Sequence, residues 1–299
     1  MNRFSRRRID TQRERERSRH NIRGEICRES IVDLIAFSME NESPGRRKRA
    51  RDEEAPQDDS LSLEDHRTFS DTMVALRIMR TQFPKMEKVS VEPFILRSQL
   101  YSSVKDRTQV DRELESLRKE KVLRIFKLNT GQDDQAVMFM DDYLKQMDSA
   151  VKRVKAKDPA DVVVFEWFKM YVITSNLDVG IGHHELCFLL SSAGNVKDDH
   201  ISLLINAGLV TRQLADSDMY WFSIPNIGSL LKGLSQGRKE LMSFMKRRKY
   251  KEMMLALLEK KRLRFSQLDI RFHLRDLIGT GLLKTVETPT GLLVRVAKD

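Results

Sequence analysis

Histidine and cysteine side chains that could hold a metal ion cluster in one short stretch of the sequence. The segment GHHELC carries His183, His184 and Cys187, and His200 follows farther along the chain. Imidazole and thiolate are the usual zinc ligands, but a structural zinc site normally shows paired ligand spacing, which this stretch lacks. Cys187 also falls on an apolar helical pattern in a unit that needs no metal to fold. We therefore expect a core cysteine with surface or capping histidines, and no cofactor.

Paired carboxylates, which could serve acid–base chemistry, occur in the segments GQDDQ and VKDDH. Each pair falls in a predicted turn or at a predicted helix start, where aspartate accepts hydrogen bonds from free backbone amides and suits the helix dipole. Phosphoryl transfer would need a glycine-rich phosphate loop, a strand lysine, a catalytic-loop aspartate with its asparagine and a metal-binding aspartate before Phe-Gly. The sequence contains none of these motifs, and EDHRT at 64–68 has the residues of a kinase catalytic loop in the wrong order. We therefore predict a protein that is not an enzyme and has no catalytic residues.

Basic side chains are concentrated between residues 238 and 264. This stretch holds 11 lysine and arginine residues against Glu240, Glu252 and Glu259, a local balance of +8 where the whole chain carries +10. Such a charge favours a polyanionic partner, nucleic acid before an acidic membrane surface. Lysine and arginine bind phosphates with an affinity that carries no sequence information and falls with salt. The alternative is a solvated helix surface, but such surfaces normally mix both signs of charge.

Most of these cations lie in one helical pattern, GRKELMSFMKRRKYKEMMLALLEKK, which begins at Gly237. Its apolar stripe changes side around KRRKYK: Leu241, Phe244 and Met245 share one face, and a second group that starts with Tyr250 lies about half a turn away. We expect one face to serve the second domain and the other the third, with the cations at the joint between them. A second basic group follows, before a short strand predicted at FSQL.

The predicted third helix of the last domain, IRFHLRDL, offers Arg271, His273 and Arg275 to a nucleic-acid groove. Its counterpart in the second domain starts with Asp198 and Asp199, which repel phosphate, and the one in the first domain mixes both signs and suits protein contact or scaffolding. The residues predicted to bind DNA are Lys246, Arg247, Arg248, Lys249, Lys251, Lys260, Lys261, Arg262, Arg264, Arg271 and Arg275.

Residues 1–67 differ in composition from the rest of the chain. They alternate arginine with glutamate and then turn acidic, with few aromatic residues and no sustained periodicity, which predicts a disordered tail. The cluster RRKRAR within it is typical of a nuclear import signal, with a solvated charge run as the alternative. The import residues are Arg46, Arg47, Lys48, Arg49 and Arg51. Only Cys27 and Cys187 are present, which favours a reducing compartment, and we expect neither export nor a membrane span.

From residue 68 onward the same order of elements is predicted three times: three helices, then a two-stranded hairpin. This is the winged-helix plan, so the predicted fold class is α+β, mainly helical, with three tandem winged-helix domains at 68–157, 158–236 and 237–299. The spacing between the last turn of the third helix and the first hairpin strand is the same in all three domains. Gly208 and Gly281 can take the left-handed conformation there, and in the first domain either Lys121 does so or the turn differs. The hairpin aromatics Phe126, Phe139, Trp221 and Phe222 are expected to fill cores rather than to stack on bases.

Four segments carry a resemblance to a known family: PFILRSQLYSSVKDRTQVDRELESL, LINAGLV, GRKELMSFMKRRKYKEMMLALL and HLRDLIGTGLL. Over residues 70–299 the chain resembles the serine/threonine-protein kinase 19 family, nuclear proteins built from tandem winged helices. The resemblance implies nucleic-acid binding, a chromatin setting, a capacity for self-association and a link to repair of transcription-blocking DNA damage. The kinase in the family's name has no counterpart in the residues of this chain.

Two hypotheses from different classes follow. The first is a nuclear, non-enzymatic protein that acts in transcription-coupled repair. It binds double-stranded DNA with little sequence preference at the joint between the second and third domains, and whether RNA takes the place of DNA is left open. The second is an adaptor whose winged helices dock onto a larger nuclear assembly and whose basic surface meets an acidic protein. A homodimer is compatible with both, and a membrane partner is expected in neither.

Overall fold

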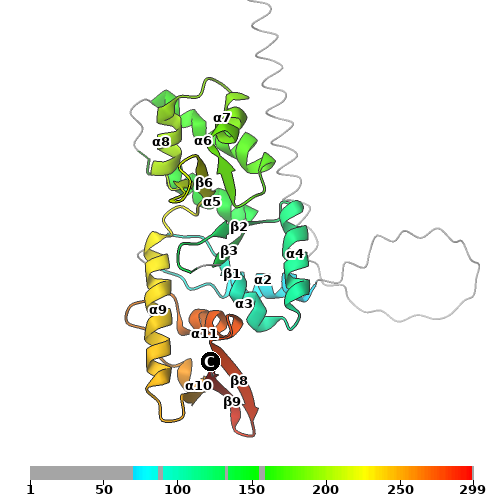
Figure 1. The fold of residues 1–299 in the computed structure, drawn as a ribbon, viewed down its shortest axis with the longest axis vertical. Coiled ribbons are helices and arrows are strands. Elements are labelled where there is room, and N and C mark those ends of the chain that lie inside the picture. The colour runs from blue at the N-terminus through cyan, green and yellow to red at the C-terminus, as the bar shows by residue number, and fades with distance from the viewer. Residues whose placement is uncertain (1–69, 87–89, 132–133, 155–158, 298–299) are drawn as a thin grey trace, which may run out of the picture. The chain divides into compact units, whose positions relative to one another are not determined.

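The computed structural model describes residues 70–86, 90–131, 134–154 and 159–297. These residues belong to one compact unit, His66–Asp299. The predicted tail and its import cluster, Arg46–Arg51, lie outside the described residues. In the described part no helix is long and apolar enough to cross a membrane. Figure 1 shows the helices and strands, and their order confirms the predicted mixture of helix and strand.

The first repeat of the element pattern occupies residues 71–151. It consists of α2 (Asp71–Thr81), β1 (Ile95–Leu96), α3 (Arg97–Ser103), α4 (Arg107–Lys119), β2 (Leu123–Lys127), β3 (Gln135–Phe139) and α5 (Met140–Val151). Asp106 starts α4 because its carboxylate accepts hydrogen bonds from the backbone amides of Thr108 and Gln109. The strands form an antiparallel sheet in the order β1-β3-β2. Helix α5 has no counterpart in the sequence prediction.

The second repeat has the same order and the same sheet topology. It consists of the 3₁₀ turn η1 (Pro159–Val163), α6 (Val164–Trp167), the π-helical η2 (Phe168–Ile173), β4 (Gly180–Gly182), α7 (His183–Ser191), α8 (Asp198–Asn206), β5 (Val210–Arg212) and β6 (Met219–Phe222). Its antiparallel sheet has the order β4-β6-β5. Arg124 of β2, which is 1% exposed, joins this repeat to the first by donating hydrogen bonds to the carbonyl oxygens of Ile173 and Asn176.

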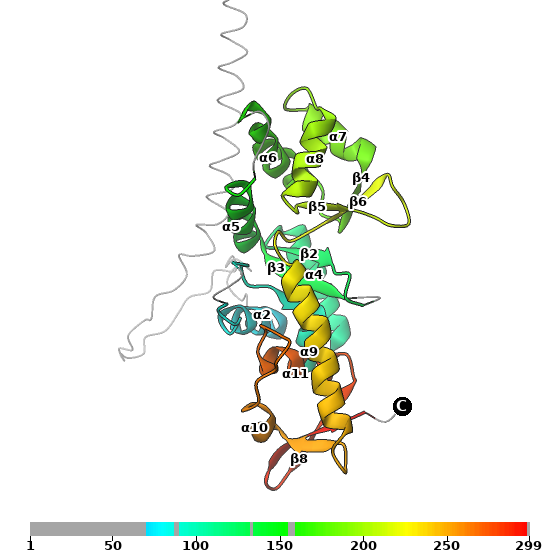
Figure 2. The same ribbon diagram turned by 90° about the vertical axis from the view of Figure 1, so that its left-hand side faces the viewer.

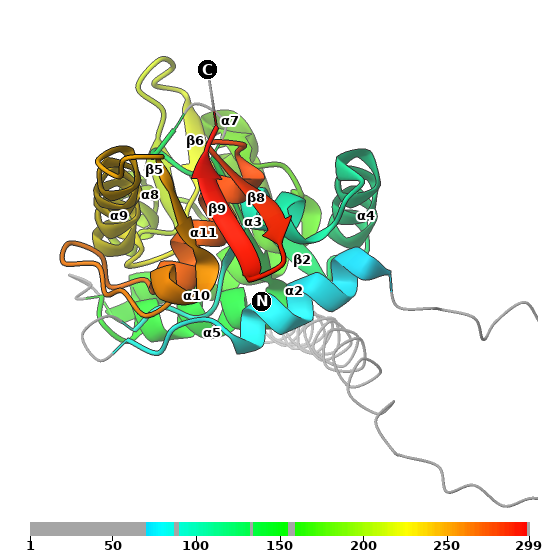
Figure 3. The same cartoon turned by 90° about the horizontal axis from the view of Figure 1, so that it is seen from below.

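The third repeat corrects two details of the sequence prediction. It consists of α9 (Gly228–Lys246), β7 (Glu252–Met254), α10 (Leu255–Leu258), α11 (Ile270–Gly279), β8 (Leu283–Thr288) and β9 (Gly291–Val296), with the sheet order β7-β9-β8 (Figure 3). The single helix predicted through KRRKYK is wrong, because α9 ends at Lys246 and Lys251 turns the chain with a φ of 52°. The short strand predicted at FSQL is also wrong, since the short strand of this repeat is β7, which precedes α10.

The three turns that leave the third helices have the predicted conformation. Lys121, Gly208 and Gly281 have φ values of 59°, 73° and 81°. In the first two turns the amide after this residue donates back into the last helical turn, Val122 to the Leu117 carbonyl and Leu209 to the Leu204 carbonyl, both at 3.0 Å. Lysine accepts the left-handed conformation in the first repeat at some cost in strain, because a Cβ disfavours it.

The buried apolar residues form three clusters that do not coincide with the three repeats. The largest contains most of the second repeat together with Phe94 and Phe126 from the first and Leu234 and Phe272 from the third. Two smaller clusters lie within the first and the third repeats. The predicted core role is confirmed for Phe126, Phe139 and Phe222. Trp221 is only half-buried, and the Lys127 ammonium lies 4.8 Å from its ring centroid.

Helix α11 of the third repeat packs closely against α3 of the first (Figures 1 and 3). The approach requires a residue without a side chain, because a Cβ on Gly279 would lie 1.6 Å from the carbonyl oxygen of Ser98. Polar groups then fix the contact: the Gln99 side chain donates to the Phe272 carbonyl at 2.9 Å, and Arg107 donates to the Gly279 carbonyl at 3.0 Å. The third helix of the last repeat is therefore held between α3 and the rest of its own repeat.

Candidate nucleic-acid interface

Nine cations surround the C-terminal end of α9 and the loop that follows α10. All nine are exposed. We call them the basic surface; they are Lys246, Arg247, Arg248, Lys249, Lys251, Lys260, Lys261, Arg262 and Arg264. The first five occupy the last residue of α9 and the turn before β7, and the other four occupy the loop between α10 and α11.

A single aromatic ring brings the two groups of cations together. The Arg248 guanidinium lies 4.6 Å from the ring centroid of Phe244, and the Lys261 ammonium lies 3.7 Å from it. Both distances are within the range of cation–π attraction. Phe244 is half-buried on α9 and packs against the core of the third repeat. It thus gives two segments separated in sequence a common point of attachment.

Glu240 anchors the second group to α9. Its carboxylate accepts hydrogen bonds from the backbone amides of Arg264, at 3.0 and 3.2 Å, and Phe265, at 3.3 Å. Because this glutamate is occupied by backbone amides, it holds the loop without pairing with a side chain of the basic surface. Nothing in the sequence pattern indicated that Phe244 and Glu240 would gather the cations, since both have the spacing of ordinary residues of an amphipathic helix.

The other two glutamates of the stretch pair with cations outside the basic surface. Glu252 accepts from Arg295 at 2.7 Å, and Glu259 lies 3.3 Å from Arg271. Among the residues that the structure describes, none of the nine cations has a carboxylate within ion-pair distance. The positive charge of this surface is therefore left without local neutralisation.

Helix α11 does not present a groove-facing side as predicted. His273 is fully buried, with Nε2 2.8 Å from the Ser266 hydroxyl, and burial lowers its pKa to about 4. Arg275 is half-buried and donates to the Gln82 side chain. Only Arg271 of the predicted trio is exposed. The prediction failed because the sequence did not reveal that α3 would cover this helix.

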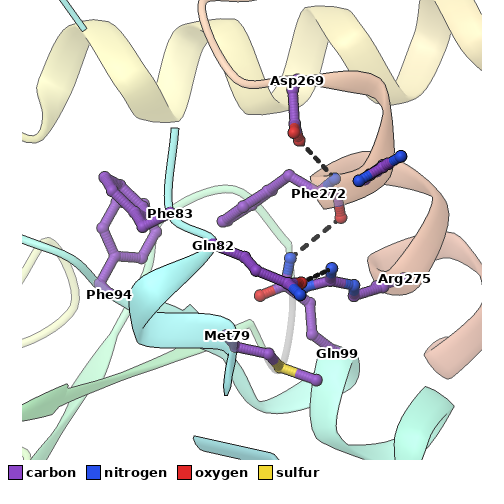
Figure 4. Close-up of a pocket in the computed structure, with 9 residues that line it drawn as sticks. Met79, Gln82, Phe83, Phe94, Gln99, Asp269, Phe272 and Arg275 are labelled. Atoms are coloured by element: carbon purple, nitrogen blue, oxygen red, sulfur yellow. Dashed lines mark hydrogen bonds between the residues drawn. The ribbon is translucent and has the colours of Figure 1, made fainter. Parts of the chain in front are cut away.

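The side chain of Arg275 lies at a pocket of about 190 Å³ between α2, α3 and α11 (Figure 4). The pocket is lined by Met79, Gln82, Phe83, Phe94, Gln99, Asp269, Arg271, Phe272 and Arg275. The hydrogen bonds drawn in Figure 4 tie its polar groups to one another: Asp269 accepts from the Phe272 amide, and Gln99 donates to the Phe272 carbonyl. We regard the pocket as part of the α3–α11 contact.

The basic surface does not lie at the joint between the second and third repeats. That joint is formed by the N-terminal half of α9, where Leu230 and Leu234 belong to the cluster that contains the second repeat. Leu241 and Met245, farther along the helix, belong to the core of the third repeat instead. The cations follow at the opposite end of α9, close to α10 and the third sheet (Figure 2). The predicted position at the joint is therefore wrong.

A family model described as inactive serine-threonine protein kinase 19 matches residues 66–296. The chain belongs to this family. Three relatives, each called winged helix repair factor 1, are similar to it. The human protein is 29% identical over 69% of this chain and 78% of its own length, and that of Xenopus laevis is 29% identical over 72% and 80%. The protein of Dictyostelium discoideum is 26% identical over 83% of this chain and 68% of its own length.

The histidines and cysteine of this family member are engaged in ordinary packing contacts. His183 lies 3.1 Å from the Tyr220 hydroxyl and 3.7 Å from the Cys187 sulfur. His200 is buried elsewhere, with Nε2 3.1 Å from the Asp161 carboxylate. Burial raises the pKa of the Cys187 thiol, which disfavours a thiolate ligand. In the described residues no three metal-ligating side chains converge.

The third helices of the other repeats both contain acidic residues. In α4, Arg118 donates to Glu115 and, across the junction with the second repeat, to the Leu177 carbonyl and Asp178. This agrees with the scaffolding role expected for that helix. Helix α8 begins with the exposed Asp198 and Asp199. Within this member of the family, the basic surface is therefore the strongest candidate for contact with a polyanion.

Proposed function

We propose that this chain is a nuclear, non-catalytic protein of three tandem winged helices that binds double-stranded DNA and serves DNA repair. The three copies of one element order, each with a three-stranded sheet, support three domains, although the predicted boundary between 158–236 and 237–299 falls inside α9, which begins at Gly228. The name of the relatives, winged helix repair factor 1, supports both the winged-helix fold and a role in DNA repair. The family description as an inactive kinase supports a role without catalysis. We further propose that the repair in which this chain takes part is transcription-coupled.

The observation that carries the proposal is the basic surface. Phe244 and Glu240 bring together the two segments that carry the nine exposed cations, and the nearby Glu252 and Glu259 pair with other cations. A duplex carries one phosphate charge about every 1.7 Å along its axis, so an unneutralised group of cations gains affinity by releasing condensed counterions. Arg271, exposed beside Glu259, lies at the border of this surface.

We infer that binding depends little on base sequence. Specific readout requires side chains that reach base edges, usually from a helix in the major groove. In this chain α11 is covered by α3, α8 begins with two aspartates and the Arg118 side chain of α4 is held by Glu115 and Asp178. Contacts from flexible lysine and arginine side chains to phosphates fix position without reading bases.

The proposal predicts steeply salt-dependent binding to duplexes of unrelated sequence. The affinity of the full chain for labelled duplexes of about 20 base pairs, measured by fluorescence anisotropy, should fall with salt with a log–log slope of about −4 or steeper, as expected for four or more phosphate contacts. Two duplexes of different sequence should agree within about threefold, because each mismatch at a reading site costs more than that. A slope near zero would favour the adaptor hypothesis, in which the basic surface meets an acidic protein.

A further inference from the structure

Two large aromatic rings stand exposed among the cations of the basic surface. Tyr250 is 68% exposed and Phe265 is 63% exposed. Tyr250 is flanked in the chain by Lys249 and Lys251, and Phe265 follows Arg264. The two rings therefore come from the two segments that Phe244 and Glu240 bring together. The sequence pattern predicted that Tyr250 lies on the apolar face of a helix. Its side chain is exposed instead, because α9 ends before this residue.

Neither ring serves the core of the third repeat. That core is built from residues such as Leu241, Met245 and Leu258, with Phe244 packed against it, and it includes neither Tyr250 nor Phe265. The backbone of Phe265 is fixed by Glu240, while its ring remains in solvent. The Lys249 ammonium lies 5.3 Å from the Tyr250 ring centroid. Each ring is thus presented on an anchored segment and surrounded by positive charge.

Exposed aromatic rings within a basic surface fit one kind of ligand chemistry. Bases stack on aromatic side chains with a gain that is largely independent of sequence, while cations beside them bind the backbone phosphates. The paired bases of a duplex are already stacked on one another and offer no free face. An unpaired base does offer one. An acidic protein would need only the cations, and it would gain less from two separated rings.

We infer that Tyr250 and Phe265 are stacking platforms for unpaired bases, so that the basic surface takes nucleic acid in which a duplex adjoins a single strand. This inference rests on the proposed function, because it assigns the ligand of the same surface. Phe265 is anchored at Glu240, and Lys246 lies about 9 Å farther along the helix axis, before the turn that carries Tyr250. The two rings are therefore presented by segments that meet α9 at different points along its axis.

The test compares a plain duplex with the same duplex carrying a single-stranded thymidine overhang. At one fixed salt concentration the overhang should tighten binding of the full chain about tenfold or more, as expected for one or two stacked bases. Tyr250→Leu with Phe265→Leu should abolish this gain and leave the affinity for the plain duplex within about twofold, since leucine keeps apolar bulk but has no aromatic face. Tyr250→Phe should retain the gain.

A fluorescent base analogue in the overhang provides a readout specific to stacking. Its emission should be quenched by the wild-type chain and not by the double leucine variant. Phe188→Leu is the matched control, because Phe188 is 71% exposed on α7 and lies outside the basic surface. If the plain duplex binds with steep salt dependence but the overhang adds nothing, the inference is overturned and the proposed function stands. If neither ligand binds, both are overturned.

Discussion

Replacing Arg238 by alanine is expected to lower the free energy of unfolding by about 3–5 kcal/mol, the usual cost of stranding one partner of a buried ion pair. Arg238 on α9 donates to both oxygens of Asp276 on α11, at 2.6 and 2.9 Å, and also to Asp134 at 2.5 Å. Asp276 is fully buried, and its other partner is the Ser98 hydroxyl at 2.6 Å. Without the guanidinium its charge would have no cation beside it.

The pKa of Arg238 reflects this environment. Burial lowers the pKa of the guanidinium, but hydrogen bonds to Asp276 and Asp134 raise it, and the net direction is upward. The folded state therefore holds the charged form more firmly than the unfolded state does. Because the ordinary arginine pKa already lies far above neutral pH, this contribution to stability is complete throughout the neutral range and would be lost only in strongly alkaline solution, as the pH rises through the raised pKa.

Urea denaturation of the full chain measures the change in the free energy of unfolding, which is taken from the transition of the folded unit. Lys239→Ala is the matched control, because Lys239 is the exposed neighbour on the same helix, and it should change stability by no more than about 0.5 kcal/mol. The double variant Arg238→Ala with Asp276→Ala should be less destabilised than the two single changes added together, since neither buried charge is then stranded. Equal effects of Arg238→Ala and Lys239→Ala would contradict the assigned role.

Reversing the charge of Lys246, Arg247 and Lys260 to glutamate is expected to weaken duplex binding by an order of magnitude or more at moderate salt. The salt slope should flatten by roughly one unit for each lost phosphate contact. These three residues are chosen because all are exposed and none is among the cations that flank Phe244. Their replacement should therefore leave the loop anchored and the melting temperature unchanged.

The matched control reverses three exposed cations in the first repeat, Lys105, Arg112 and Lys119. It changes the net charge by the same amount, and it avoids Arg118, which joins the first and second repeats. This variant should lose much less affinity. Equal losses in the two variants would mean that the charge acts as a diffuse field, and no loss in either would favour the adaptor hypothesis.

The parts of the fold that depend on local chemistry could be predicted from the sequence. Helix starts at capping residues such as Asp106, the left-handed residues Lys121, Gly208 and Gly281, and the apolar faces of the hairpins all follow from interactions between near neighbours in the chain. The excess of cations after Arg238 is likewise a property of the sequence alone.

The parts that depend on packing between distant segments could not be predicted. Nothing local shows that Gly279 lets α11 approach α3, so the helix that seemed open to a groove is covered. The end of α9 was missed because the change of side of the apolar stripe around KRRKYK was interpreted as two faces of one helix, whereas the chain turns there to pair β7 with β9. The convergence of Arg248 and Lys261 on Phe244 required the fold, because 13 positions separate the two cations in the chain.

Protection of individual lysines from acetylation, measured by mass spectrometry on the full chain with and without saturating duplex, tests most directly whether the basic surface contacts DNA. Acetylation of Lys246, Lys249, Lys251, Lys260 and Lys261 should slow severalfold when the duplex is bound, because a phosphate then covers each ammonium group. Lys119 and Lys145, 69% and 63% exposed at their side chains and outside the basic surface, should react at unchanged rates. A bound duplex that leaves Lys246, Lys249 and Lys260 as reactive as in the free protein would contradict the account.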